Sequence, residues 1–543
     1  MNISLRRLIL SLLGVTLLGL LLAGCGGQSP SAKGNILHMA NGTEPADLDP
    51  QTVTGRPEST ILRTLIQGLV RDDPKGVAPL PGQAESWDVS EDGKTYTFRL
   101  RPDAKWSNGD TVTAQDFVGS WKRMLTPSLG SEYSYQLYIV EGAEAYNKGK
   151  TTDFNTVGFR TIDERTLTVQ LRNPTAYFLN LLLHQSWFPV HLPTVEKFGG
   201  LEKKGSRWTR AENYVGNGPF ILAEWNPNQH IDVVRSPTYW GAADVKIDGV
   251  RFYPIENTDT EERMFRAGQL DVTNGMPLNK IDDYRENRQD VLRVAPYLAA
   301  AYYKVNVNRP QLKDPRVRRA LALAIDRVGL TKQVLRGAKF PAWHFSPKMS
   351  GYEPADTFKD DVEEARALLA EAMADAGIAD VKDYPQIEIL YPTSDSGRIV
   401  TEALQSMWTA NLGIDVTLYN QEWKVYLDST NNQDYDVAWS AWIGDYVDPM
   451  SFLDMMVTDG GNNRTGWSNT RYDQLIQDVQ SVRDPVERAE LFYDMERIIG
   501  EECPVIPLYF YTSVNAVSTE VKGWYDTLLD IHPLHDIWLE RSE

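Results

Sequence analysis

The sequence predicts an α/β fold with an additional strand-rich region near its start. Apolar and polar residues alternate over 95–100 and 166–171, which is typical of half-buried strands. From residue 314 onward, helical and strand-like patterns alternate along the chain. Such alternation indicates a mixed or parallel sheet with helices on both faces. A chain of 543 residues should also divide into two or three lobes, because single hydrophobic cores stop growing well below this length.

The elements of the second half can be placed individually. Asp314 and Pro315 predict the start of a helix, since Asp caps a helix N-terminus and Pro suits its first turn. Apolar residues at helical spacing over 362–372 predict a second helix that stops near Gly377. A strand at 387–390, a helix around 402–408 and an alternating strand at 414–418 should follow.

The first 25 residues carry the pattern of a bacterial lipoprotein export signal. Arg6 and Arg7 precede an apolar stretch over 8–22, which ends in small residues directly before Cys25. A membrane-spanning helix is the alternative, but the stretch is shorter than about 20 residues and a tether with Gly, Ser and Pro follows. We therefore predict a signal peptide over 1–24, lipidation at Cys25, and an anchor and tether over 25–35. Cys503 would then have no disulfide partner.

Composition excludes several classes of function. The formal net charge of −19 disfavours nucleic acid and anionic lipid as partners. With 42% hydrophobic residues, the chain is not an acidic disordered protein. The 15 Trp and 25 Tyr residues can pack cores or line a pocket for flexible ligands, and core packing accounts for most of them.

Signals of catalysis or metal binding are weak. The seven His residues form no H-E-x-x-H pair, no C-x-x-C exists, and no G-x-S-x-G elbow is present. Residues 149–151 resemble the end of a phosphate loop, but Glu144 stands where its Gly is required. His532 and His535 are separated by Pro533 and are expected in loops. We expect no catalytic residue, no metal and no cofactor.

The segment 439–446 places one acid among aromatic residues. Asp445 follows Gly444 and is expected to be partly buried, and a desolvated carboxylate favours a cation such as a ligand ammonium group. The commoner role of Asp is to cap backbone amides in a loop. The residues by themselves leave both interpretations open.

Several segments together resemble the oligopeptide-binding proteins of ABC importers, within the peptide/nickel class of extracellular solute-binding proteins. The resemblance covers nearly all of the chain after the signal. The segments that carry it are 48–50, 57–59, 84–87, 96–101, 105–109, 113–117, 120–123, 217–220, 235–240 and 420–424.

The resemblance implies a two-lobed periplasmic-binding-protein fold (type II, large cluster) with a hinge and an extra strand-rich lobe. Lobe I would comprise 36–70 with 195–297 and 513–543, lobe II 71–194, and lobe III 298–512. The ligand is enclosed as the lobes close, with its backbone held as an added strand.

Site residues follow from the matching segments. Asp445 matches the Asp that pairs with the peptide ammonium, and Trp442 matches an aromatic residue beside it. Glu58 matches an acid lining the site. Backbone contacts are expected at Ala441 and Trp439, and the walls should include Tyr133, Tyr135 and Tyr302. One departure is that Trp439 and Thr430 stand where the best-known members have basic residues. Another is that Lys304 stands where an acid is usual, so Lys304 could meet a carboxylate or be a solvated strand residue.

The resulting hypothesis is a monomeric, lipid-anchored protein in the cell envelope, on the periplasmic or extracellular face. It would capture oligopeptides and deliver them to an ABC permease and its ATPase. Alternatives are the same fold binding murein peptides or another specialised solute, a peptide sensor, and, last, a hydrolase.

Overall fold

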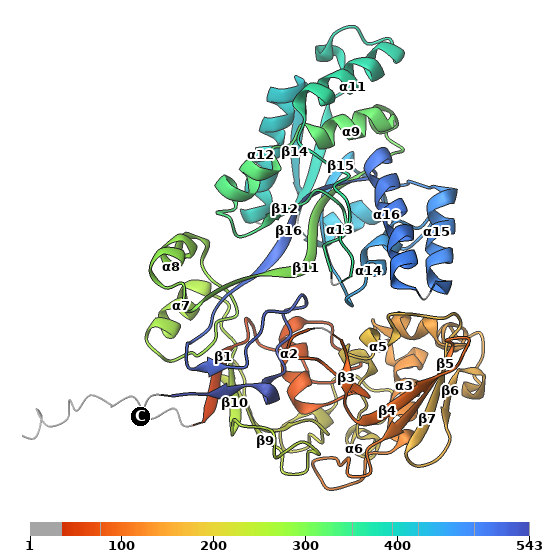
Figure 1. Cartoon of the computed structure of the whole chain (residues 1–543), viewed down its shortest axis with the longest axis vertical. Coiled ribbons are helices and arrows are strands. Elements are labelled where there is room, and N and C mark those ends of the chain that lie inside the picture. Colours follow the sequence, from red (N-terminus) through yellow and green to blue (C-terminus); the bar gives the residue numbers. More distant parts are fainter. Residues whose placement is uncertain are drawn as a thin grey trace, which may run out of the picture. The chain divides into compact units, whose positions relative to one another are not determined.

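The computed structural model of the chain describes residues 35–76, 78–349, 351–393, 395–421, 423–482 and 484–541 (Figure 1). The predicted signal peptide, Cys25 and nearly all of the tether lie outside the described residues, as does Glu422. From Leu37 to Glu543 the chain forms one compact unit. None of the helices among the described residues combines the length and apolar character needed to cross a membrane.

An antiparallel sheet, here called the N-terminal sheet, has the strand order β1-β10-β9-β8. Helix α2 packs Ile61, Leu62 and Leu65 against Phe220 and Ile231 of this sheet in one apolar core. The strands are β1 (Ile36–Ala40), β8 (Phe220–Asn226), β9 (His230–Arg235) and β10 (Gly249–Tyr253), and the helices of these segments are α2 (Arg56–Leu65), α6 (Leu192–Phe198), α7 (Thr258–Arg266) and α8 (Ile281–Asn287).

A second sheet has the strand order β4-β5-β7-β6. Its strands β5 and β7 confirm the two alternating segments of the sequence, and Phe98 and Trp121 are fully buried beside it. The elements are β2 (Val70–Arg71), β3 (Leu80–Pro81), β4 (Ala84–Val89), β5 (Thr95–Leu100), β6 (Phe159–Thr161), β7 (Thr166–Gln170), α3 (Ala114–Leu125), α4 (Ala143–Asn147) and α5 (Phe178–Leu181).

The large sheet is mixed, with the strand order β12-β16-β11-β15-β13-β14. Strand β13 runs parallel to β14 and β15, whereas β11 is antiparallel to β15 and β16. The strands are β11 (Leu292–Val305), β12 (Phe340–Pro341), β13 (Ile387–Pro392), β14 (Val416–Gln421), β15 (Val437–Ile443) and β16 (Val505–Ala516). A short ladder of β17 (Val521–Lys522) and β18 (Trp538–Leu539) lies near the C-terminus.

Helices cover both faces of the large sheet, with α12 on one side and α16 on the other (Figure 1). The predicted caps are confirmed: the Asp314 side chain accepts from the amide of Arg316, and Gly377 has a φ of +74° just after α11. The predicted strand at 414–418 begins later than expected, at Val416. The helices are α9 (Pro315–Leu323), α10 (Arg327–Gly329), α11 (Val362–Asp375), α12 (Asp395–Leu412), α13 (Trp423–Asn431), α14 (Met450–Leu453), α15 (Thr470–Ser481) and α16 (Pro485–Glu502).

Strands β11 and β16 extend beyond the large sheet to the N-terminal sheet (Figure 1). At that end, the amide of Ala516 donates to Thr273 and the amide of Val517 donates to Val291. The pairing of the two strands shifts register between Pro296 and Ala300. The connection between the two sheets is thus a two-stranded ribbon with an interruption in its ladder.

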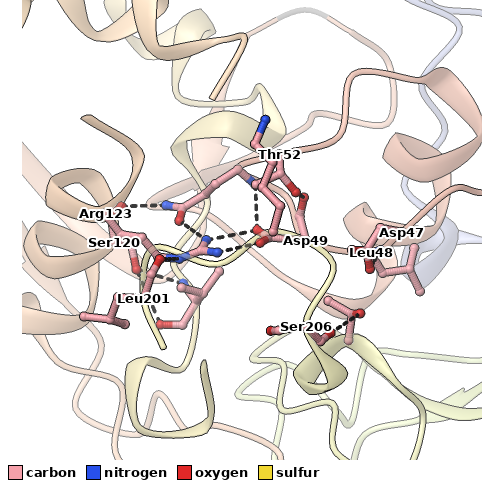
Figure 2. A network of polar contacts seen from close by, with 12 residues as sticks. Asp47, Leu48, Asp49, Thr52, Ser120, Arg123, Leu201 and Ser206 are labelled. Atoms are coloured by element: carbon pink, nitrogen blue, oxygen red, sulfur yellow. Dashed lines mark hydrogen bonds and ion pairs between the residues drawn. The ribbon is translucent and has the colours of Figure 1, made fainter. Parts of the chain in front are cut away.

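A buried ion pair joins α3 to the segment before α2 (Figure 2). The Arg123 guanidinium donates to both carboxylate oxygens of Asp49 at 3.0 and 2.6 Å. It also donates to Gln51 Oε1 at 2.6 Å and to the carbonyl of Leu201 at 2.7 Å. The side chains of the pair are 0% and 1% exposed, so the charges depend on each other for compensation.

Replacing Arg123 alone should destabilise the protein strongly. Arg123→Met leaves Asp49 buried without its cation and should lower the free energy of unfolding by about 3–5 kcal/mol, measured by equilibrium denaturation in urea. The double variant Asp49→Leu Arg123→Met is the matched control and should recover much of the loss, because no uncompensated charge remains. A loss below about 1 kcal/mol in the single variant, typical of a surface pair, would contradict this assignment.

Candidate functional site

A central cavity of about 620 Å³ is the candidate site. It is lined by the end of β15, by two Tyr residues of the second-sheet region, by α2 and by the C-terminal segment. The lining residues used below are Arg56, Arg63, Arg71, Asp72, Tyr133, Tyr135, His184, Tyr297, Ala441, Trp442, Ile443, Gly444, Asp445, Trp524, Asp530 and His532.

Asp445 brings a carboxylate to this cavity directly after β15. Its amide donates to Ser451 Oγ at 2.9 Å, and the Tyr135 hydroxyl donates to its Oδ2 at 3.4 Å. Burial raises the pKa of Asp445 to about 6. No Lys, Arg or His of the described residues forms an ion pair with it. The carboxylate is therefore desolvated but uncompensated, and a cation would stabilise its charged form.

Gly444 lets the chain pass close to the side chains of Leu298 and Phe452 just before Asp445. Its amide donates to the carbonyl of Leu298 at 2.8 Å. A Cβ at this position would lie 2.7 Å from the Leu298 side chain and 3.0 Å from Phe452. A larger residue would push the end of β15 away from β11, so Gly444 keeps the segment that carries Asp445 close to β11.

Aromatic residues form the wall opposite Asp445. The rings of Tyr133 and Tyr135 are 6.0 Å apart, and Tyr133 packs edge-on against His184 at 4.5 Å. Burial raises the pKa of Tyr135, with a further contribution from Asp445, so its hydroxyl stays a donor. Trp442 is fixed by a hydrogen bond from its Nε1 to the carbonyl of Ser451 at 2.6 Å. These rings offer flat apolar surface with polar edges.

Beyond its first two residues, β15 has an open edge. Strand β13 pairs with β15 at Val437 and Ala438 and then continues beside β14. Gly444 bonds to β11, and in an antiparallel ladder successive residues alternate in direction. Trp439, Ala441 and Ile443 therefore direct their amides and carbonyls away from β11. This edge, residues 439–443, can accept an added strand.

Three predicted site residues do not line the central cavity. Glu58 is buried in the first turn of α2 and accepts from the amide of Ala46 at 2.7 Å. Tyr302 is buried in the large sheet and packs edge-on against Phe345 at 5.2 Å. Trp439 is half-buried, and its carbonyl accepts from the Tyr426 hydroxyl at the open edge. Asp445, Trp442, Ala441, Tyr133 and Tyr135 are brought together in the cavity wall.

A charged cluster in the cavity wall was not anticipated from the sequence. The Arg56 guanidinium pairs with Asp530 and lies 5.5 Å from the Tyr297 ring. His532 contacts Asp530 at 2.9 Å and stacks on Trp524 with ring centroids 3.7 Å apart. These residues come from α2, β11 and the C-terminal segment, so no local spacing connects them. Nearby, Arg63 and Asp72 pair at 2.6 Å.

Among the described residues, one group of side chains could supply metal ligands, and it lies outside the cavity wall. Glu224, His230 and Asp232 come together on the β8–β9 hairpin. Arg251 already binds both oxygens of Asp232, at 2.7 and 2.5 Å. This ion pair competes with a metal for one of the three ligands, so the group gives no support to a metal centre.

Comparisons with known proteins match this architecture. The model of the family described as bacterial extracellular solute-binding proteins, family 5, matches residues 78–464. The oligopeptide-binding protein OppA of Bacillus subtilis is 36% identical over 523 residues, which are 93% of this chain and 94% of that protein.

Solved structures of relatives have the same fold. The murein tripeptide-binding protein MppA of Escherichia coli aligns with a TM-score of 0.77 and 32% identity, covering 94% of this chain and 99% of that one. OppA of Haemophilus influenzae in complex with the peptide RPPGFSPFR aligns with a TM-score of 0.75 and 34% identity, covering 93% and 99%. The predicted two-lobed α/β fold is thereby confirmed. The chain belongs to family 5 of the bacterial extracellular solute-binding proteins, among the peptide-binding members that serve ABC importers.

Proposed function

We propose that this protein captures oligopeptides outside the cytoplasmic membrane and delivers them to an ABC permease. The observation that carries the proposal is the Asp445 carboxylate, which faces the cavity without a cationic partner among the described residues and stands at the end of an open strand edge. A peptide supplies both missing partners, an ammonium group and a strand of backbone amides and carbonyls.

In the proposed binding mode, the peptide lies along the open edge of β15 with its amino group at Asp445. Backbone groups of Ala441 and Trp439 bond to it, while Trp442, Tyr133 and Tyr135 form the walls. Glu58 and Tyr302 would not contact the peptide themselves. Glu58 fixes the start of α2 beside Arg56, and Tyr302 supports β15 through its hydrogen bond to Ser440. Backbone bonding gives affinity without strong side-chain preference.

The division into lobes I, II and III is part of the same proposal. It is supported by the sheets, since the N-terminal sheet is built from segments assigned to lobe I and the second sheet from segments assigned to lobe II. The large sheet falls mainly in 298–512, and β11 and β16 cross its limits. These two strands would form the hinge about which the lobes close.

Native mass spectrometry of the chain beginning at Gly26 tests the function directly. Purified without added ligand, the protein should carry a ladder of small-peptide masses that disappears on denaturation, because a cavity with backbone recognition retains mixed peptides. Fragmentation of the released ligands gives their sequences and lengths. A protein that is purified without ligand and also fails to bind a mixed peptide library would refute the proposed function, although not the fold.

Asp445→Asn should weaken peptide binding by about 3–5 kcal/mol, because the ammonium loses its buried partner charge. The wild type should also lose affinity as the pH falls below about 6, since the pKa of Asp445 is raised to about 6 and the ammonium binds only the deprotonated carboxylate. That pH dependence should be weaker in the variant. Calorimetry with trialanine to pentaalanine between pH 5 and pH 8 measures both effects.

Asp244→Asn serves as the matched control, since Asp244 is exposed and outside the cavity wall. It should bind like the wild type at every pH. Equal affinity of the Asp445→Asn variant and the wild type at pH 8 would remove Asp445 from the site.

Anchoring through Cys25 is proposed from the export signal. The chain extracted from membranes should begin at Cys25 and carry acyl chains, as its intact mass would show, because several chains anchor a protein more firmly than one. Cys25→Ser should leave the protein unanchored and in the soluble fraction. Recovery of an acyl-free chain in the membrane would contradict the anchor, and crosslinking of the anchored chain to a permease tests delivery against a sensory role.

Murein peptides are a second candidate ligand class, favoured by the likeness to MppA, a periplasmic murein peptide-binding protein that is 34% identical over 486 residues. Ordinary and cell-wall peptides both present a free amine to Asp445. The masses of the retained ligands distinguish them, since cell-wall peptides give a few sharp adducts instead of a ladder.

A further inference from the structure

A pair of stacked tyrosine rings joins proposed lobe II to proposed lobe III next to Asp445. The rings belong to Tyr177, at the start of α5, and to Tyr446, directly after Asp445. They lie parallel within 9°, with centroids 4.4 Å apart. Neither ring lines the central cavity. The stack therefore lies beside the proposed site for the ligand amino group without forming part of its wall.

Each ring is fixed to its own lobe. Tyr177 precedes Phe178, which is fully buried and packs edge-on against an aromatic ring of β5 with centroids 4.7 Å apart. Tyr446 lies two residues before Asp448, whose carboxylate oxygens accept from the Arg488 guanidinium of α16 at 2.6 and 2.9 Å. A rotation of one lobe against the other cannot carry both rings along, so it has to separate them.

The surface between the two lobes is not closely packed around the stack. A cavity of about 290 Å³ has walls from both lobes, including Tyr138 and Tyr177 of lobe II and Met450 and Gln480 of lobe III. In the same place, the Asn173 side-chain amide donates to Gln480 Oε1 at 3.3 Å. Protein interiors are normally filled to high density. An interface that leaves such a space depends on a few separate contacts, and each of them can be removed individually.

Tyr135 connects this interface to the proposed ligand site. It lines both the central cavity and the smaller one. Its hydroxyl, which belongs to lobe II, donates to Asp445 Oδ2 at 3.4 Å. Because Tyr446 is the next residue after Asp445, one movement of lobe II brings the hydroxyl to the carboxylate and the two rings into contact.

We propose that Tyr177 and Tyr446 form a latch that holds lobes II and III together at the Asp445 end of the site and slows the release of a bound peptide. The inference rests on the proposed function, because the lobes must separate when the ligand leaves. A pair of aromatic rings stabilises a contact beyond the area that it buries. Since the rings do not touch the ligand, the latch slows release by the same factor for every peptide.

The rate of peptide release tests the latch. Tritiated pentaalanine is bound to the full chain in detergent and chased with an excess of unlabelled peptide. Tyr177→Leu should speed release about 3- to 10-fold, because the stacked pair is lost. The preference for a free over an acetylated amino group should stay as in the wild type, since Asp445 is unchanged. Tyr177→Phe keeps the ring and should release the peptide at the wild-type rate.

Tyr493→Leu is the matched control. Tyr352 and Tyr493 are also stacked, within 17° and with centroids 5.5 Å apart, but both belong to lobe III. This variant loses a similar pair without changing the contact between lobes, so it should release the peptide at the wild-type rate. Asn173→Ala is a second test at an exposed residue, where the substitution does not endanger folding. It should speed release by a smaller factor, because the Asn173–Gln480 hydrogen bond also joins the two lobes.

Distances between two spin labels test the latch without a ligand. The chain beginning at Gly26 contains the whole compact unit, and its native Cys503 is fully buried and should not be labelled. Labels are placed at exposed positions, on Glu164→Cys in lobe II and on Gln477→Cys in lobe III. Adding Tyr177→Leu should lengthen and broaden the distribution of distances, because the lobes are held together less firmly.

Two results would overturn the inference. One is a Tyr177→Leu variant with the wild-type release rate or the wild-type distances. The other is equal acceleration of release by Tyr177→Leu and Tyr493→Leu, which would assign the effect to a general loss of stability. Failure of every peptide to bind the wild type would instead refute the proposed function. In that case the label distances would still decide whether the stack holds the lobes together.

Discussion

The open edge of β15 is the constraint on which the site depends. Strand β13 pairs with β15 at two residues and continues to pair with β14. Among the described residues, the backbone of 439–443 therefore has no strand partner on the side facing away from β11. An exposed strand edge is an aggregation hazard unless it is covered. Here residues 441–443 of the edge lie in the cavity wall together with residues of α2 and of the second-sheet region, and a bound peptide would complete the edge.

An uncompensated charge, the Asp445 carboxylate, follows the end of this edge. The Asp49 carboxylate shows the contrasting case, because it is buried but receives two direct hydrogen bonds from the Arg123 guanidinium. Asp445 has no cationic partner among the described residues, and burial raises its pKa to about 6. A ligand ammonium group would restore Asp445 to its charged form, so the energetic cost of leaving this carboxylate unpaired in the free protein would be recovered when the ligand binds.

Much of the fold could be predicted from the sequence, because helix caps and alternating strands are local patterns. Asp445 could be singled out because Gly444 and the surrounding aromatic residues are its neighbours in the chain. The burial of Glu58 and Tyr302 could not be predicted, since it depends on packing against segments distant in sequence. The Arg56–Asp530 pair joins residues 474 positions apart, and no pattern within either segment indicates it.

The interruption in the β11–β16 ladder is where a hinge between the proposed lobes would lie. One register shift falls between Pro296 and Ala300, beside Tyr297 at the Arg56 wall, and a second falls between Ala301 and Tyr302, where β11 already pairs with β15. A rotation of the lobes about this point would move Tyr133 and Tyr135 relative to Asp445. It would leave Ala441 and Ile443 in place beside β11, because both residues belong to the large sheet. Closure would therefore control how deeply a peptide is buried, while the open edge of β15 would keep the same backbone groups available to it.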